Sequence, residues 1–136
     1  MENSTDHHHV FRLRPGEDLR GSIEHMLAER NIDAGWITSC VGSLRTFCLR
    51  FANEQTASVR NGYFEIISLS GTVSRNGCHL HIAVADNTGT TIGGHLLHGC
   101  TIYTTAEIVL TQSGNYLFKR ESDPESGFQE LWIGTS

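Results

Sequence analysis

Three histidines in residues 77–99 have the spacing of metal ligands. In an extended strand, His79 and His81 project from the same face, because alternate side chains point to opposite faces. His95 follows a turn at residues 86–89, which folds its segment back beside the first strand as a hairpin. Three imidazoles with one open coordination position suit zinc better than other metals. The spacing therefore predicts a metal site at His79, His81 and His95, with zinc as the metal.

The residues that alternate with His79 and His81 are apolar, so the opposite face of this strand is expected to pack against the core. The histidine face continues into Ala83 and Ala85, unlike an ordinary solvated face, and we expect another sheet or another subunit to cover it. An alternative therefore stays open, in which the histidines are partly buried and hydrogen-bonded at a subunit contact. His98 falls on the opposite face by strand alternation and lies outside the predicted site.

Two carboxylates interrupt apolar strand segments. Glu65 lies within residues 63–67 and Glu107 within residues 104–109. A carboxylate in such a place needs a partner, which is an arginine, a histidine or a metal-bound water. Arg45 is the candidate to meet either carboxylate or an anionic ligand. Structural pairing is the favoured interpretation; the catalytic interpretation makes Glu107 and Glu65 proton-transfer groups and Arg45 an anion-binding group.

The elements that must position these residues form an α+β fold of antiparallel β-sheets with one flanking helix. Apolar residues at helical spacing predict the helix over about residues 18–31. After Gly35 the period changes to about two, which is typical of strands. The expected strands are residues 10–14, 36–41, 46–52, 63–69, 78–85, 91–97, 104–110 and 116–120. The turn signals between them are residues 60–62, 75–77, 86–89 and 113–115. Residues 128–132 are expected to dock on the body of the domain.

Composition bounds the domain organisation and the class of partner. The 136 residues match one domain, residues 1–136, with a flexible tail at residues 1–9. A net charge of −5, a single lysine and ten scattered basic residues argue against a dedicated nucleic-acid-binding domain. The chain has no long apolar run and no signal-like start, so we expect a cytoplasmic protein without membrane contact. The four cysteines lack CxxC spacing and are expected to be reduced, without a disulfide.

Several blocks of sequence run through the chain in a recognisable order. They are RLRPGEDL at residues 12–19, VGSL at 41–44, GYFEIISLSG at 62–71, HLH at 79–81, AD at 85–86, GGHL at 93–96 and TAE at 105–107. Together they resemble the PPC domain, a family named for plants and prokaryotes. The resemblance implies a homotrimer and places the chain among stand-alone prokaryotic members that are commonly labelled DNA-binding proteins. In the plant relatives a separate AT-hook with an RGRP core binds DNA; the nearest phrase here, RLRP, lacks its glycine.

The implied fold is also similar to that of acetolactate decarboxylase, whose zinc is held by an HxH pair and a later histidine. His79, His81 and His95 match that pattern in order. Two function classes stay open. The leading one is a trimeric regulatory or scaffolding protein with a three-histidine metal site, a protein partner and, at most, weak DNA contact. The other is a metal-dependent lyase or hydrolase acting on a small anionic metabolite.

Overall fold

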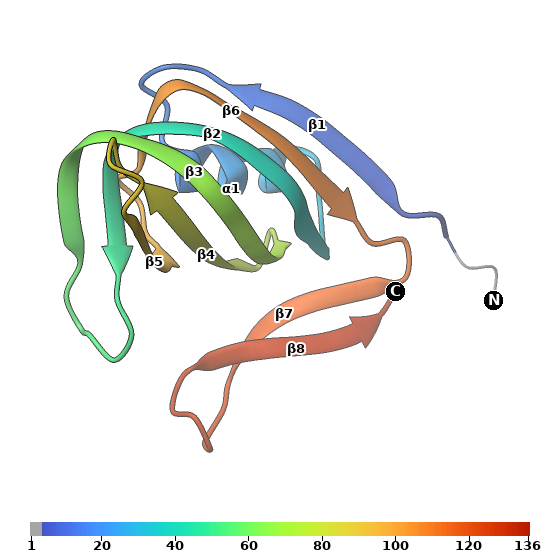
Figure 1. Ribbon diagram of the computed structural model, residues 1–136. Coiled ribbons are helices and arrows are strands. Elements are labelled where there is room, and N and C mark those ends of the chain that lie inside the picture. Colours follow the sequence, from blue (N-terminus) through green and yellow to red (C-terminus); the bar gives the residue numbers. More distant parts are fainter. Residues whose placement is uncertain (1–3) are drawn as a thin grey trace.

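The computed structural model describes residues 4–136 and contains a six-stranded antiparallel sheet, one helix and a separate two-stranded hairpin (Figure 1). The strand order in the large sheet is β1-β6-β2-β3-β4-β5. Its strands are β1 (His7–Leu13), β2 (Gly35–Arg50), β3 (Ser58–Ser74), β4 (Gly77–Ala85), β5 (Thr91–Leu96) and β6 (Thr101–Gln112). The helix is α1 (Leu19–Glu29), and the hairpin consists of β7 (Tyr116–Ser122) and β8 (Gln129–Thr135). The predicted α+β class is confirmed. Among the described residues, no helix is long and apolar enough to cross a membrane.

Helix α1 covers one face of the large sheet. Leu19, Ile23 and Leu27 are spaced four residues apart and are fully buried, as an amphipathic helix requires. On the sheet, Leu80 and Val84 of β4 are each only 1% exposed and belong to the same core. The predicted helix and the predicted core face of the histidine strand are both confirmed. The histidines consequently project from the face that α1 does not cover.

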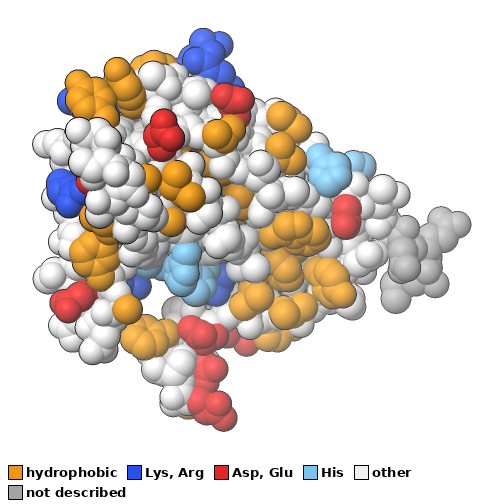
Figure 2. All heavy atoms as spheres, in the orientation of Figure 1, with side chains coloured by type: hydrophobic (Ala, Val, Ile, Leu, Met, Phe, Trp, Pro, Cys, Tyr) orange, Lys and Arg blue, Asp and Glu red, His pale blue; other side chains and the backbone are white. Residues whose placement is uncertain are grey.

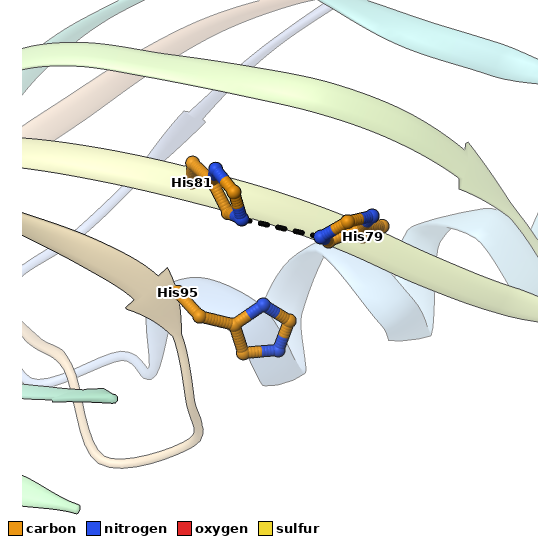
Figure 3. A group of neighbouring side chains, drawn as sticks. All are labelled: His79, His81 and His95. Carbon is orange, nitrogen blue, oxygen red and sulfur yellow. Dashed lines mark hydrogen bonds between the residues drawn. The ribbon is translucent and has the colours of Figure 1, made fainter. Parts of the chain in front are cut away.

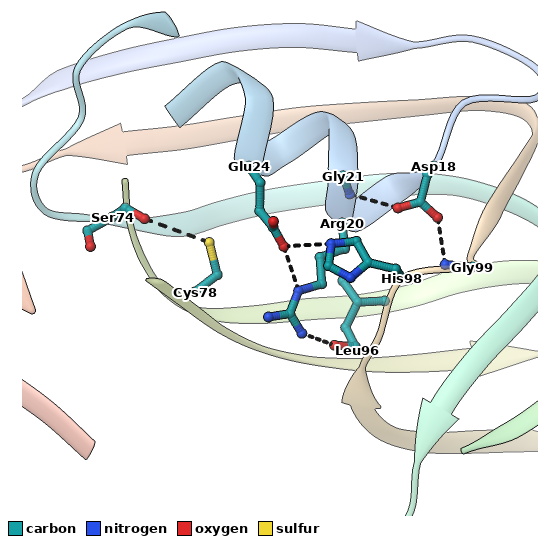
Figure 4. A network of polar contacts seen from close by, with 9 residues as sticks. All are labelled: Asp18, Arg20, Gly21, Glu24, Ser74, Cys78, Leu96, His98 and Gly99. Atoms are coloured by element: carbon teal, nitrogen blue, oxygen red, sulfur yellow. Dashed lines mark hydrogen bonds and ion pairs between the residues drawn. The ribbon is translucent and has the colours of Figure 1, made fainter. Parts of the chain in front are cut away.

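Polar contacts tie the first turn of α1 to the chain that follows β5 (Figure 4). The Asp18 carboxylate caps the helix by accepting hydrogen bonds from the backbone N–H groups of Gly21 and Gly99, both at 2.7 Å. Arg20 donates to the carbonyl oxygen of Leu96 at 2.7 Å and pairs with Glu24. Leu96 follows His95 directly, so this network fixes the backbone next to one predicted ligand.

Strand β2 replaces two expected strands. Residues 36–41 and 46–52 join into one long strand, and register shifts on either side of Leu44 absorb the irregular residues between them. The turn predicted at residues 60–62 is also wrong. Asn61 lies inside β3, pairs with Thr46 and accepts a hydrogen bond from its hydroxyl at 2.8 Å. Sheet pairing on both sides of β2 outweighs the local turn propensity of Asn-Gly.

Both ends of the described chain differ from the sequence prediction. His7 to His9 belong to β1 and pair with β6, and the His9 ring also hydrogen-bonds the Gln112 side chain at 2.9 Å. The tail predicted for residues 1–9 is therefore wrong for these histidines, and residues 1–3 lie outside the described residues. At the other end, β8 pairs only with β7, and Phe128 is 71% exposed rather than docked on the body.

The far end of β2 closes the sheet on itself. Figure 1 shows β2 bending across the sheet until its end lies beside β5. There Leu49 pairs with Leu96, and Arg50 pairs with His95. Directly paired residues in adjacent strands share a face of the sheet. This closure therefore places Arg50 on the same face as His95.

Candidate metal centre

The three predicted histidines converge on one point (Figure 3). His79 and His81 extend from β4, and His95 extends from β5, directly opposite His81 in the strand register. The Nε2 atoms of His79 and His81 are 3.2 Å apart. One ring nitrogen from each of the three residues lies within 4.8 Å of the others. The sheet register alone thus brings all three imidazoles together.

The donor set fits a zinc ion. Zinc–nitrogen bonds of about 2.0–2.1 Å in tetrahedral geometry place ligand nitrogens about 3.3 Å apart, close to the His79–His81 separation. Burial, followed by the charge of Arg50, lowers the pKa of His95 to about 4. Burial, followed by His81, also lowers the pKa of His79. These two rings are therefore neutral near pH 7, the form in which imidazole binds a metal.

The structure does not bring the three predicted catalytic residues to this centre. Glu107 is exposed on β6, opposite Arg12 of β1. Glu65 is exposed on β3 opposite Ala85, four residues beyond His81, and lines a separate hollow of about 550 Å³. Within residues 4–136, the group of side chains that could hold a metal ion consists of His79, His81 and His95 and includes no carboxylate.

Arg45 has partners other than the predicted carboxylates. Its guanidinium donates a hydrogen bond to the Gly62 carbonyl at 2.7 Å and lies 4.0 Å from the centre of the Tyr63 ring. None of the ion pairs among the described residues joins it to Glu65 or Glu107. The predicted pairing with a carboxylate is therefore wrong. Stacking on an aromatic ring is a common position for a guanidinium and satisfies Arg45 without an acid.

His98 lies apart from the centre, as strand alternation predicts. Its Nε2 atom pairs with the Glu24 carboxylate of α1 at 2.9 Å (Figure 4). Sequence reasoning missed two residues that do lie at the centre, Arg50 and Arg120. The first arrives through the β2–β5 pairing, and the second comes from the C-terminal hairpin and donates from Nη2 to the Thr72 hydroxyl at 2.9 Å. No local motif marks either arginine.

Comparison with known proteins identifies the family. The sequence model of the Plants and Prokaryotes Conserved (PCC) domain, also abbreviated PPC, matches residues 1–114. The chain belongs to this family. The structure of a hypothetical protein from Salmonella enterica is 36% identical, with a TM-score of 0.95, and the match covers 98% of this chain and 97% of that one. Since that match is nearly complete, the relative shares the C-terminal hairpin that lies beyond the PPC match.

Two further relatives match most of the chain. A structure described as a metal-containing protein from Archaeoglobus fulgidus is 27% identical, with a TM-score of 0.76, over 97% of this PPC chain and 99% of that one. A protein named bifunctional protein GlmU, from Synechococcus sp. strain JA-3-3Ab, is 47% identical over 123 residues. That match covers 90% of this chain but only 20% of the GlmU protein, so the chain spans a fifth of the length of this curated relative.

Proposed function

We propose that this PPC-domain protein binds one zinc ion per chain through His79, His81 and His95, with a coordination position open to water or a ligand. The observation that carries the proposal is the convergence of three imidazole nitrogens from two paired strands. Neutral rings at two of the positions favour binding, because a metal then displaces no proton from them. The Archaeoglobus relative, described as metal-containing, supports the same assignment.

Metal analysis of untagged protein tests the proposal. After reconstitution with zinc and removal of excess metal, mass spectrometry is expected to find one ion per chain. Cobalt(II), which replaces zinc in tetrahedral sites, should give the visible absorption of that geometry. A variant with His7, His8 and His9 changed to alanine is the control, because these consecutive histidines could hold metal on their own. If this control bound no ion although His79, His81 and His95 are intact, the result would contradict the proposal.

We also propose that the protein is a homotrimer, as its family resemblance implies, and that the uncovered sheet face forms the contact between copies. Val10, Val41 and Ile67 lie in three different strands of the sheet and are 72%, 57% and 56% exposed. A soluble monomer rarely leaves several large apolar side chains open on one sheet face. A regulatory or scaffolding role in a trimer, with a protein partner, is consistent with this arrangement.

Changing Val41 to glutamate is expected to break the trimer. A glutamate there would lie opposite the carboxylate of Glu107, its direct cross-strand neighbour, and a charge buried between copies without a partner costs several kcal/mol, which exceeds what most interfaces tolerate at micromolar concentration. Light scattering on a sizing column should show three times the 15.1 kDa chain mass for wild type and a single chain mass for the variant. Ala28→Glu, on the exposed side of α1, is the matched control and should stay trimeric. A monomeric wild type would refute the assembly.

DNA binding remains a prediction of the family resemblance and has little support in this chain. The net charge is −5 and the only lysine is Lys119. A DNA-binding surface needs a cluster of cations to neutralise phosphates.

The enzyme alternative has one specific observation in its favour, the open hollow beside the histidines. Its predicted acid and base residues, Glu65 and Glu107, do not reach that hollow.

A further inference from the structure

A hollow of about 470 Å³ lies between the histidine centre and the C-terminal hairpin. Its lining includes Arg50, His79 and His95 from the sheet, and Arg120, Gln129 and Glu130 from the hairpin. Figure 2 shows histidine atoms in a depression of the surface with Lys or Arg atoms beside them. The volume is in the range of sites that hold small molecules. A ligand that reaches the open coordination position through this hollow passes Arg50 and Arg120.

Arg50 stands on one side of the centre. It is the direct cross-strand partner of His95, and it also lines a second hollow with His79 and His81. Among residues 4–136, none of the ion pairs involves Arg50. Arg50 is therefore an unneutralised cation held beside a metal ligand by the sheet register.

Arg120 stands on the other side and is held more firmly. Its Nη2 atom donates to the Thr72 hydroxyl at 2.9 Å, and Thr72 is the direct cross-strand partner of His79. Its stem crosses β4 at Gly77, where a Cβ atom would lie only 2.8 Å from the Arg120 Cγ atom. Arg120 also takes part in no ion pair within the described part of the chain. The hairpin thus delivers a half-buried guanidinium to the centre and leaves most of its N–H groups free.

The charges in the hollow favour an anion. Two guanidinium groups, those of Arg50 and Arg120, line the hollow with one carboxylate, that of Glu130. A divalent ion adds two further positive charges. Guanidinium groups bind carboxylate and phosphate oxygens through paired, charge-assisted hydrogen bonds. A metal with an open position binds the same oxygens, so both kinds of group select the same ligand chemistry.

We propose that the metal centre takes a small molecule with a carboxylate or phosphate group, whose anionic oxygens bind the metal and the guanidinium of Arg120, with Arg50 adding charge on the opposite side. The inference rests on the proposed metal site. It assigns the β7–β8 hairpin, which lies beyond the PPC match at residues 1–114, as the part of the molecule that selects the ligand. A relative with a different hairpin would then take a different anion at the same three histidines.

Titration of the cobalt(II)-loaded protein with oxalate and, separately, with inorganic phosphate tests this inference at fixed ionic strength. Wild type should show a saturable change in the cobalt spectrum with at least one of the two anions, and the stronger one identifies the preferred group. Arg120→Gln should weaken that affinity about tenfold or more, since a charge-assisted hydrogen bond is lost. Arg50→Gln, which removes a more exposed group, should weaken it less. Arg75→Gln is the control, because Arg75 pairs with Asp33 away from the hollow, 2.6 Å between Nε and Oδ1.

The metal content of each sample is measured in parallel and separates the two proposals. A wild-type protein that holds no cobalt overturns the metal site, and the anion site with it. A cobalt-loaded wild type that responds to neither anion below about 10 mM overturns the anion site alone. So does an Arg120→Gln variant that keeps its metal and binds the anion as tightly as wild type. If Arg120→Gln is poorly folded, Arg120→Lys gives the decision, because lysine keeps the charge but loses paired hydrogen bonding. Arg120→Lys should bind the anion more weakly than wild type, and wild-type affinity in this variant would overturn the anion site.

Discussion

Replacing His81 by alanine is expected to abolish zinc binding. His81 is the central ligand, because its Nε2 atom lies 3.2 Å from that of His79 and its backbone pairs directly with His95. Without His81, only the ring nitrogens of His79 and His95 remain, and two protein ligands do not hold zinc as the three of a catalytic-type site do. Loss of a residue that merely supports a ligand typically costs 10- to 100-fold in affinity, so loss of a ligand should cost more than about a hundredfold. Competition with a chelator of known affinity measures the change.

The matched control is His98→Ala. His98 is also an exposed histidine near the end of β5, but its ring pairs with Glu24 on the other side of the sheet. This variant should keep one zinc per chain with unchanged affinity. Wild-type affinity in His81→Ala would mean that the three rings are hydrogen-bonded histidines rather than ligands. An equal loss in both variants would instead indicate general damage to the strands.

The histidine centre could be predicted because short-range rules determine it. Alternation places His79 and His81 on one face, and a tight turn at residues 86–89 brings β5 back along β4. The turn is reinforced by Asp86, whose carboxylate accepts from the backbone N–H of Thr88 at 2.9 Å. A slip of one residue in this hairpin would turn the wrong faces of its strands toward the core, and the tight turn selects the register that sets His95 opposite His81.

The arginines could not be predicted, because they reach the centre through contacts between distant parts of the chain. Arg50 and His95 are paired only because the sheet curls until β2 meets β5. Arg120 belongs to a hairpin that touches the sheet through few residues, among them Thr72. The same limit explains the failure of Arg45 as a carboxylate partner. Alternation gives the face on which a side chain lies, but it does not give the neighbouring strand.

Local turn and tail signals failed where the large sheet offered pairing. The Asn61-Gly62 pair is a strong turn signal, yet both flanking segments gain more from pairing with β2 than a tight turn would provide. The same holds for His7 to His9, whose polar run suggested a tail but whose backbone pairs along β6. The likeness of the fold to acetolactate decarboxylase stays a prediction.

Gly71→Ala is expected to cause the largest loss of stability among single changes near the centre. Gly71 lies in β3 with φ at +147°, a backbone conformation that residues with a side chain rarely adopt. A Cβ atom there would also overlap the carbonyl oxygen of His79, across the β3–β4 ladder. Because this Cβ atom is fixed to the backbone of β3 and the carbonyl oxygen belongs to the backbone of β4, β4 must move away from β3 at His79, the first metal ligand. We expect a loss of about 3 kcal/mol or more in the free energy of unfolding, a fall of about 10 °C or more in Tm, and weaker zinc binding.

Gly16→Ala separates the two causes of this effect. Gly16, which lies between β1 and α1, also has a positive φ, +88°, but nothing lies within 4 Å of a Cβ atom placed there. Its substitution should therefore cost about 1 kcal/mol from backbone conformation alone and should leave zinc affinity unchanged. The difference between the two variants measures the contact between Gly71 and the His79 backbone. Equal melting temperatures would mean that β4 gives way without cost, and the close approach of β3 and β4 at Gly71 would then play no part in holding His79 in place.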